Sequence, residues 1–405
     1  MRKGFLDMSK ILITGNGFDL FHYLPTKYHH FIAIMETIEK FQFKDEVAFS
    51  DLFGRFYKDR FPHDFNSIIE NYNVEQIKFD NSKIERIDEL LKINPWYKYF
   101  KNVTEIDTWI DFEIEIEVIL NKLNYFSGNV SKLNLKENYI EISSDEYTDL
   151  EMLGVIKIIS NRIVKLQDRY FNKRRFSIEM KLILEDLSKS FEDFIVIFNR
   201  YLVDVVGNFY LEIIHKSSIS FHLIDEIYTF NYTPTLENIY KVDKSKVVYL
   251  HGEINEDSQE QNLVLGVSDI LDELKQFKPY GFTKYYQKIK KNSNKKFVDF
   301  PKVNTLYDEE TFFYIVGHSL DKSDKEYILE LFRFLEQDKL NKSKICVFYY
   351  DNNDKAGKIK NLLSIIDEKI ISRMNRENRL CFVELNDGNL EKEFKQILYK
   401  HQIVY

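Results

Sequence analysis

The alternation of apolar runs and amphipathic segments after residue 224 constrains the fold more than any other feature. Runs of strand length lie at 226–231, 246–251, 263–266, 311–317, 344–350 and 379–384. Helical periodicity separates several of them, at 235–242, 323–336, 354–366 and 389–401. Repeated strand–helix alternation is typical of a parallel sheet covered on both faces. We therefore expect an α/β fold built on a parallel sheet flanked by helices.

A further strand is predicted near the amino end, at 10–14, and a glycine pair follows it at once, in Gly15-Asn16-Gly17. A helix is expected from Thr26 to Lys40. A strand, a glycine turn and a helix are the parts of a phosphate-binding site. Gly15 and Gly17 permit positive φ and let a diphosphate approach the backbone. The segment indicates nucleotide binding, although Leu20 stands where the dinucleotide fingerprint has its third glycine, and a tight turn without a ligand is the alternative.

Residues 41–218 follow a different pattern, because their apolar residues recur mostly at helical spacing. The polar stretch 129–147 is expected to be loop. We predict that 8–40 and 219–405 form the nucleotide-binding core and that 41–218 form a mainly helical insertion or cap. Trp109 and Glu113 are four residues apart and so share a helical face. Trp109 is interpreted as a core anchor, and the functional alternative is that Glu113 reaches the site as a second carboxylate.

The amino-acid composition and the net charge argue against several classes of protein. The formal net charge of −8 lacks the basic excess that usually marks nucleic-acid binding, and the lysine-rich run 288–296 is interpreted as a solvated loop. Two cysteines without a CxxC pair exclude a cysteine zinc site and argue against a disulfide framework. No apolar run approaches the ~18 residues that span a bilayer, and no signal peptide is visible. We expect a cytoplasmic protein without a metal.

Polar residues follow four of the expected strands. They are Gly15, Asn16 and Gly17 after the first, Thr229, Asn231 and Thr233 after the second, His251 with Gly252 after the third, and Gly317, His318 and Ser319 after the fourth. Ligands of open parallel sheets bind at the carboxyl ends of the strands, so these groups should converge on one crevice. Each of these groups also has a purely structural interpretation. Asn231 could cap a helix through an Asx turn, and His251 could bond a buried backbone carbonyl. Ser319 or Asp321 could cap a helix near 323, with Asp324 in the first turn of that helix.

With these strand ends assembled, the chain resembles the AbiH family of bacterial phage-defence (abortive infection) proteins. The amino-terminal half carries the resemblance in the segments 15–20, 24–28 with Phe31, and Trp109-x-Asp111-x-Glu113. The carboxyl half carries it in the segments 229–232, 250–252 and 315–320. AbiH proteins are in turn distantly similar to sirtuin-like NAD-binding domains. The resemblance thus implies a Rossmann-like, sirtuin-like sheet, with Asn231 and His251 at the positions of the sirtuin catalytic residues. Because the zinc cysteines of deacetylating sirtuins are absent, NAD cleavage is the closer analogy.

The resulting hypothesis is an NAD-cleaving hydrolase that acts in anti-phage defence. His251 would serve as the base and Asn231 would hold a ribose hydroxyl or the attacking water. The expected cofactor-binding residues are Gly15, Asn16, Gly17, Asp19, Thr26, Thr229, Gly317, His318 and Ser319, with NAD as substrate or ligand. A phage-derived trigger and a second copy of the chain are candidate partners, and neither a membrane nor nucleic acid is expected as one.

Two alternatives remain open. The chain could be a nucleotide-binding sensor without turnover. It could also be a nuclease-like toxin that uses Asp19, Asp321 and Asp324 with a metal, although these carboxylates lack a recognised ligand pattern.

Overall fold

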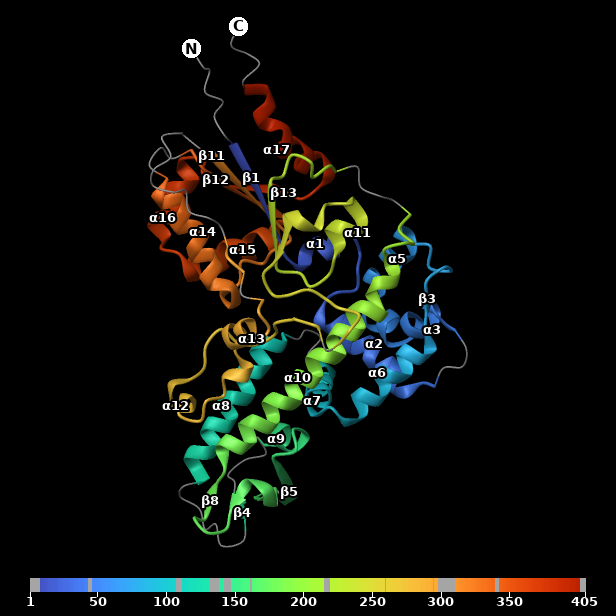
Figure 1. The fold of residues 1–405 in the computed structure, drawn as a ribbon, viewed down its shortest axis with the longest axis vertical. Helices are drawn as coiled ribbons and strands as arrows, with labels where there is room; N and C mark the ends of the chain where they lie inside the picture. Colours follow the sequence, from blue (N-terminus) through green and yellow to red (C-terminus); the bar gives the residue numbers. More distant parts are fainter. Residues whose placement is uncertain are drawn as a thin grey trace.

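The fold is built on a six-stranded sheet in the order β10-β9-β1-β11-β12-β13, in which all neighbours run parallel (Figure 1). The computed structural model describes residues 8–400 apart from 43–45, 107–110, 131–137, 142–146, 161, 215–218, 259, 294, 298–309 and 339–341. The strands are β1 (Met8–Thr14), β9 (Glu226–Thr229), β10 (Val247–Tyr249), β11 (Glu310–Val316), β12 (Lys344–Tyr349) and β13 (Leu380–Glu384). The predicted parallel sheet is confirmed.

Helices cover both faces of this sheet, as the alternation of strands and helices predicted. Side chains alternate along a strand, so Ile11 and Ile13 pack on one face while Leu12 packs on the other. The first face carries α14 (Lys325–Gln337), α15 (Asn352–Ile365) and α16 (Glu368–Arg376). The second carries α1 (Asn16–Phe21), α11 (Thr235–Tyr240) and α17 (Asp387–Lys400). In Figure 1 the two groups lie on either side of the sheet.

The strand order fixes where a ligand can bind. β1 lies inside the sheet, with β9 and then β10 on one side and β11, β12 and β13 on the other. The chain order therefore reverses between β1 and β11. Ligands of open α/β sheets bind outside the carboxyl ends of the strands at such a switch point. The loops after Thr14 and Val316 flank this position.

One predicted strand does not form. Residues 263–266 are buried but lie outside the sheet. Val264 N donates to His251 O at 2.8 Å, and the Gln287 side chain bonds both Leu265 N at 3.0 Å and Leu265 O at 2.7 Å. The prediction was wrong because loop and side-chain partners, rather than a neighbouring strand, satisfy the backbone of this apolar segment.

A second block of the chain is mainly helical. It comprises α2 (Tyr28–Lys40), α3 (Phe49–Leu52), α4 (Lys58–Arg60), α5 (Pro62–Asn71), α6 (Asn81–Ile93), α7 (Pro95–Ile106), α8 (Phe112–Val130), α9 (Thr148–Met152) and α10 (Met180–Asp204). Its core is aromatic: Phe31, Phe100 and Phe194 pack around Phe112, and Trp96 Nε1 donates to Leu187 O at 2.9 Å. The buried residues of α2 belong to this core. Whether 8–40 and 219–405 form a separate domain stays a prediction.

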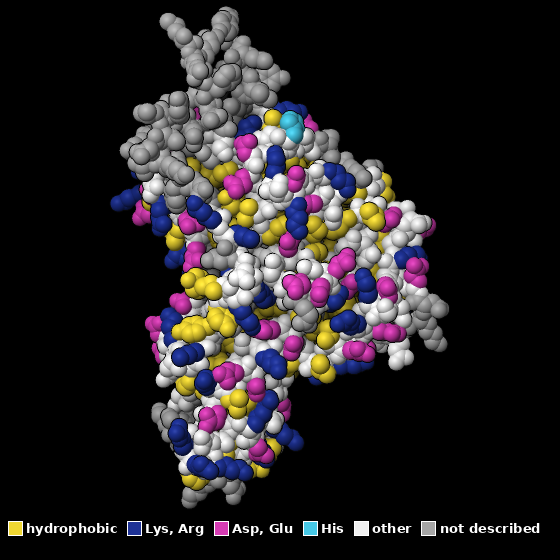
Figure 2. Space-filling view, in the orientation of Figure 1, with side chains coloured by type: hydrophobic (Ala, Val, Ile, Leu, Met, Phe, Trp, Pro, Cys, Tyr) yellow, Lys and Arg dark blue, Asp and Glu magenta, His cyan; other side chains and the backbone are white. Residues whose placement is uncertain are grey.

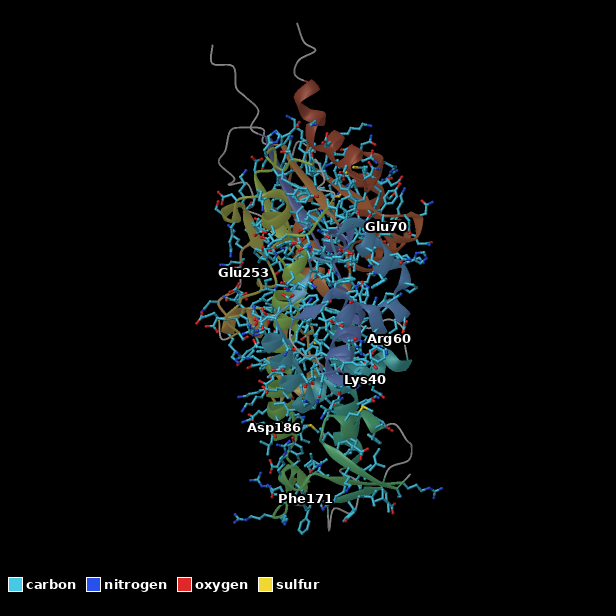
Figure 3. All side chains as sticks on the ribbon, turned by 90° about the vertical axis from the view of Figure 1, so that its right-hand side faces the viewer. Lys40, Arg60, Glu70, Phe171, Asp186 and Glu253 are labelled. Atoms are coloured by element: carbon cyan, nitrogen blue, oxygen red, sulfur yellow. The ribbon has the colours of Figure 1, made fainter. Side chains whose placement is uncertain are left out.

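Short strands accompany these helices. They are β2 (Val47–Ala48) with β3 (Lys78–Phe79), β4 (Tyr139–Glu141) with β6 (Ile163–Leu166) and β5 (Ile156–Ser160), and β7 (Phe171–Asn172) with β8 (Ser177–Ile178). The expectation of loop throughout 129–147 was therefore wrong at β4, which pairs with β6. Figure 3 shows the strands near Phe171 at one end of the molecule and the large sheet at the other. In Figure 1, α13 (Lys284–Lys290) lies next to the upper end of α8, and α12 (Asp272–Lys275) lies farther from the large sheet.

Candidate functional site

The loops after β1 and β11 pack backbone on backbone at the switch point. Gly15 N donates to Val316 O at 3.1 Å, and Gly17 N donates to Gly317 O at 2.8 Å. Neither Gly15 nor Gly17 has a positive φ, so that expectation was wrong. Glycine is needed here for close approach, because a Cβ on Gly15 would come within 2.7 Å of His318 Cα. The two N–H groups are bonded within the protein rather than directed at the cavity beside them.

Gly317 is the tightest point of this contact. Its φ is +70°, and a Cβ at this position would lie 2.0 Å from Phe18 N and 2.4 Å from Gly17 C. We expect Gly317→Ala to lower the free energy of unfolding by about 1–3 kcal/mol, through left-handed strain and displacement of the 15–17 loop. Gly357→Ala is the matched control, because a Cβ on that helical glycine meets nothing within 4 Å. Urea unfolding of both variants checks this, and equal stabilities would contradict it.

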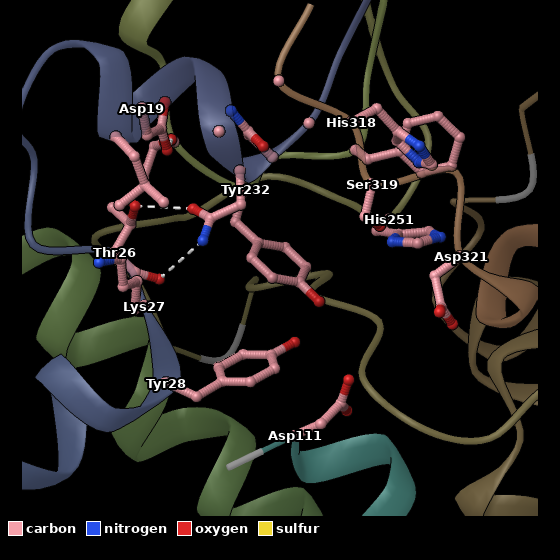
Figure 4. A pocket seen from close by; sticks show the side chains of 18 of the residues that line it. Asp19, Thr26, Lys27, Tyr28, Asp111, Tyr232, His251, His318, Ser319 and Asp321 are labelled. Carbon is pink, nitrogen blue, oxygen red and sulfur yellow. Dashed lines mark hydrogen bonds between the residues drawn. The ribbon is translucent and has the colours of Figure 1, made fainter. Parts of the chain in front are cut away.

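A cavity of about 490 Å³ opens beside these loops (Figure 4). This volume lies within the range of small-ligand sites. The lining includes all the predicted site residues except Thr229: Gly15, Asn16, Gly17, Asp19, Thr26, Asn231, His251, Gly317, His318 and Ser319. The structure thus brings together side chains that come from four strand ends.

Thr229 lies behind the cavity wall and supports it. Its hydroxyl oxygen accepts from Thr14 Oγ1 at 2.9 Å and from Asn231 N at 3.1 Å. These bonds hold the turn in which Asn231 leaves β9. Thr26 and Asn16 form a second support: Thr26 Oγ1 donates to Asn16 Oδ1 at 2.7 Å, as Figure 4 shows.

Asp19 ties α1 to the turn before α11. Its carboxylate accepts from the hydroxyls of Thr233 and Thr235, the latter at 2.7 Å. Burial raises the pKa of Asp19 to about 6, and hydrogen bonds from these two threonines and from Asn231 oppose the rise. The carboxylate is therefore well satisfied by the protein and fixes the wall that carries Asn231.

His251, His318 and Asp324 form a polar group at the opposite wall. His251 Nε2 lies 3.2 Å from Asp324 Oδ1, and His318 Nε2 lies 3.4 Å from Asp324 Oδ2. Leu320 N donates to His318 Nδ1 at 2.9 Å, so His318 is neutral and carries its proton on Nε2. Burial lowers the pKa of His251 to about 4, which leaves its imidazole neutral at pH 7.

Lys284 joins this group to the helical block. Its Nζ lies 3.2 Å from Asp324 Oδ1 and 2.9 Å from Glu113 Oε2, and all three side chains are largely buried. Burial alone would raise the pKa of Asp324, but Lys284 and His251 hold it well below its usual range. Burial raises the pKa of Glu113 to about 7 in spite of Lys284. The pKa values of two carboxylates that share one ammonium group are thus shifted in opposite directions.

The helical block supplies part of the cavity wall. Asp111, Glu113 and Tyr28 line it, together with Tyr232 from the sheet core. Figure 4 shows the Tyr28 and Tyr232 side chains extending into the space between Thr26 and His251. Trp109, the expected core anchor, lies outside the described residues.

Sequence reasoning missed Lys284 altogether and treated Asp324 chiefly as a residue in the first turn of a helix. A buried lysine at the first position of a helix after Thr283 has no local pattern that marks it. The basic run did contain a hint, since Lys288 is buried against Tyr327 rather than solvated.

Among the described residues, no group of three or more His, Cys, Asp or Glu side chains is arranged to hold a metal ion. None of the described helices has the length and apolar character needed to cross a membrane.

Fold and site together define a parallel α/β protein with a polar cavity at the switch point of its sheet. The model of the family described as bacteriophage abortive infection AbiH matches residues 11–349. The chain therefore belongs to the AbiH family of phage-defence proteins. Neither a curated protein nor a solved structure matches it.

Proposed function

We propose that this AbiH protein is an NAD⁺ glycohydrolase that depletes NAD during phage infection. The observation that carries the proposal is the meeting of Asn231, His251 and the glycine loops in one cavity at the switch point. Numbered along the sheet core, the strand order is 3-2-1-4-5-6, which is that of dinucleotide-binding Rossmann folds. A Rossmann-like core of the sirtuin-like kind, with NAD as its ligand, is part of the proposal.

The cavity suggests how NAD would lie. The diphosphate would follow the loops 15–17 and 317–319, where the exposed Asn16 and Ser319 side chains and Lys27 offer donors. The nicotinamide ribose would then extend along the strand ends toward Asn231 and His251. On the face seen in Figure 2, basic and acidic side chains of the described residues are interspersed rather than gathered into a basic surface. A small nucleotide fits this arrangement better than a nucleic acid does.

The proposed reaction is hydrolysis of the bond between C1′ of the ribose and N1 of the pyridinium. The electron pair of this bond returns to N1, so nicotinamide leaves neutral and needs no strong acid. A water molecule adds to the oxocarbenium-like C1′ and gives its proton to His251, which is neutral at pH 7. Asn231 would orient the water or a ribose hydroxyl. Asp324, 3.2 Å from His251 Nε2, would position the ring and stabilise the imidazolium that forms.

The direct test is liquid chromatography of NAD incubated with the purified full-length chain, with and without lysate of phage-infected cells. The proposal predicts that nicotinamide and ADP-ribose appear in equal amounts in at least one of the two incubations. Unchanged NAD in both would overturn the enzymatic function. Equilibrium binding of NAD without release of nicotinamide would instead indicate the sensor.

A further inference from the structure

Glu113 is one of the residues with which the helical block lines the cavity, and contacts of its two neighbours in the chain fix its position. Asp111 Oδ1 accepts from Glu113 N at 2.8 Å and so caps the start of α8. Phe112 stacks on Tyr28 with 4.2 Å between ring centroids and on Phe100 with 4.5 Å. These contacts anchor the first turn of α8 in the aromatic core. The neighbouring Glu113 side chain, 13 % exposed, is thereby held in the cavity wall.

The charges around Glu113 do not cancel. Lys284 is the cation shared by Glu113 and Asp324. Lys288 and Asp111 lie close enough to interact with this group and add one charge of each sign. When all three carboxylates are ionised, they outnumber the two ammonium groups and the group carries one net negative charge. A preorganised negative charge in a largely desolvated wall stabilises a positive charge that develops next to it. Cleavage of NAD creates such a charge on the ribose.

We propose that Glu113 is a catalytic residue that contacts the reacting ribose. Its carboxylate accepts a hydrogen bond from a ribose hydroxyl and stabilises the oxocarbenium ion as the bond between C1′ and N1 breaks. The proton of the attacking water still goes to His251, and Glu113 remains ionised throughout. This inference rests on the proposed NAD cleavage. It makes the helical insertion a part of the active site, so that the sheet core alone is incomplete.

A pH dependence follows from the ionised form of Glu113. The groups that face it from the surrounding elements are Lys284 and Lys288 on α13, Asp324 before α14, Asp111 before α8, Tyr232 after β9 and Tyr28 on α2. Because burial raises its pKa to about 7, the active ionised form is gained as the pH rises. We expect kcat/KM for NAD to increase about tenfold between pH 6 and pH 8.

The test compares Glu113→Gln with Glu113→Asp and with Glu117→Gln, a matched control at an exposed position of the same helix. Glu113→Gln should lower kcat/KM about 100-fold or more and abolish the rise between pH 6 and pH 8. Glu113→Asp should restore part of the rate and the pH dependence, and Glu117→Gln should match the wild type. Circular dichroism and melting temperature report whether each variant is folded.

The outcomes separate this inference from the function on which it rests. Suppose the wild type releases nicotinamide. A rate that does not change between pH 6 and pH 8, or a Glu113→Gln variant as active as the wild type, would then overturn the role of Glu113 and leave NAD cleavage standing. A wild-type chain that releases no nicotinamide would overturn both.

Discussion

Replacement of His251 by alanine should lower kcat/KM for NAD cleavage by about 10²–10⁴-fold, the usual cost of losing a positioned base. The imidazole is buried, neutral at pH 7 and held 3.2 Å from Asp324. The neighbouring His318 cannot replace it as a base, because its Nδ1 accepts from Leu320 N and its Nε2 faces Asp324. Initial rates of nicotinamide release at pH 7.5 measure the effect. Binding of NAD should change far less than the rate, because the glycine loops and Asn231 are untouched.

The matched control for this variant is His222→Ala, which removes an exposed histidine outside the cavity lining. It should retain wild-type activity. Thermal unfolding should show both variants folded. A His251→Ala protein that is folded and turns over NAD at the wild-type rate would remove His251 from the mechanism.

Replacement of Lys284 by methionine should lower the free energy of unfolding by about 3–5 kcal/mol at pH 8, because it leaves two buried carboxylates without their shared cation. The pKa of Asp324 is depressed in the folded chain, so its stabilising contribution is present above its unfolded value near 4. Without Lys284 the pKa values of Asp324 and Glu113 rise. The loss of unfolding free energy in the variant should therefore be smaller at pH 5, where both carboxylates can take up protons.

Urea unfolding at pH 5 and pH 8 measures this difference. Lys290→Met is the matched control on the same helix, since the Lys290–Glu192 pair is exposed and should contribute about 0–1 kcal/mol. A Lys284→Met protein as stable as the Lys290→Met protein at both pH values would show that the buried ion pairs do not hold the two blocks together.

The sheet could be predicted because each of its strands is marked by the residues of one short segment of the sequence. Runs such as 311–317 and 344–350 carry apolar residues at strand length, and polar residues mark where each strand ends. The exception is instructive: 263–266 has the same local pattern, but its hydrogen-bond partners are His251 O and the Gln287 side chain. A strand needs a neighbour, and the identity of the neighbour is a tertiary property that no short window contains.

The site was predictable to the extent that strand ends define it. Asn231, His251 and Gly317 meet in one cavity because parallel strands place their carboxyl ends at the same edge. The positive φ expected at Gly15 was wrong, and glycine is required there because His318 of the other loop lies close to it. Lys284 could not be found from its surroundings in the sequence. Its partners, Glu113 and Asp324, are distant along the chain and meet only in the folded protein.

A crystal structure of the inactive His251→Ala variant with NAD tests the central claim most directly. The account predicts the diphosphate against the loops 15–17 and 317–319, with the C1′–N1 bond directed at Asn231 and at the position vacated by the imidazole. NAD bound at another place, or a cavity that stays empty at saturating NAD, would contradict it.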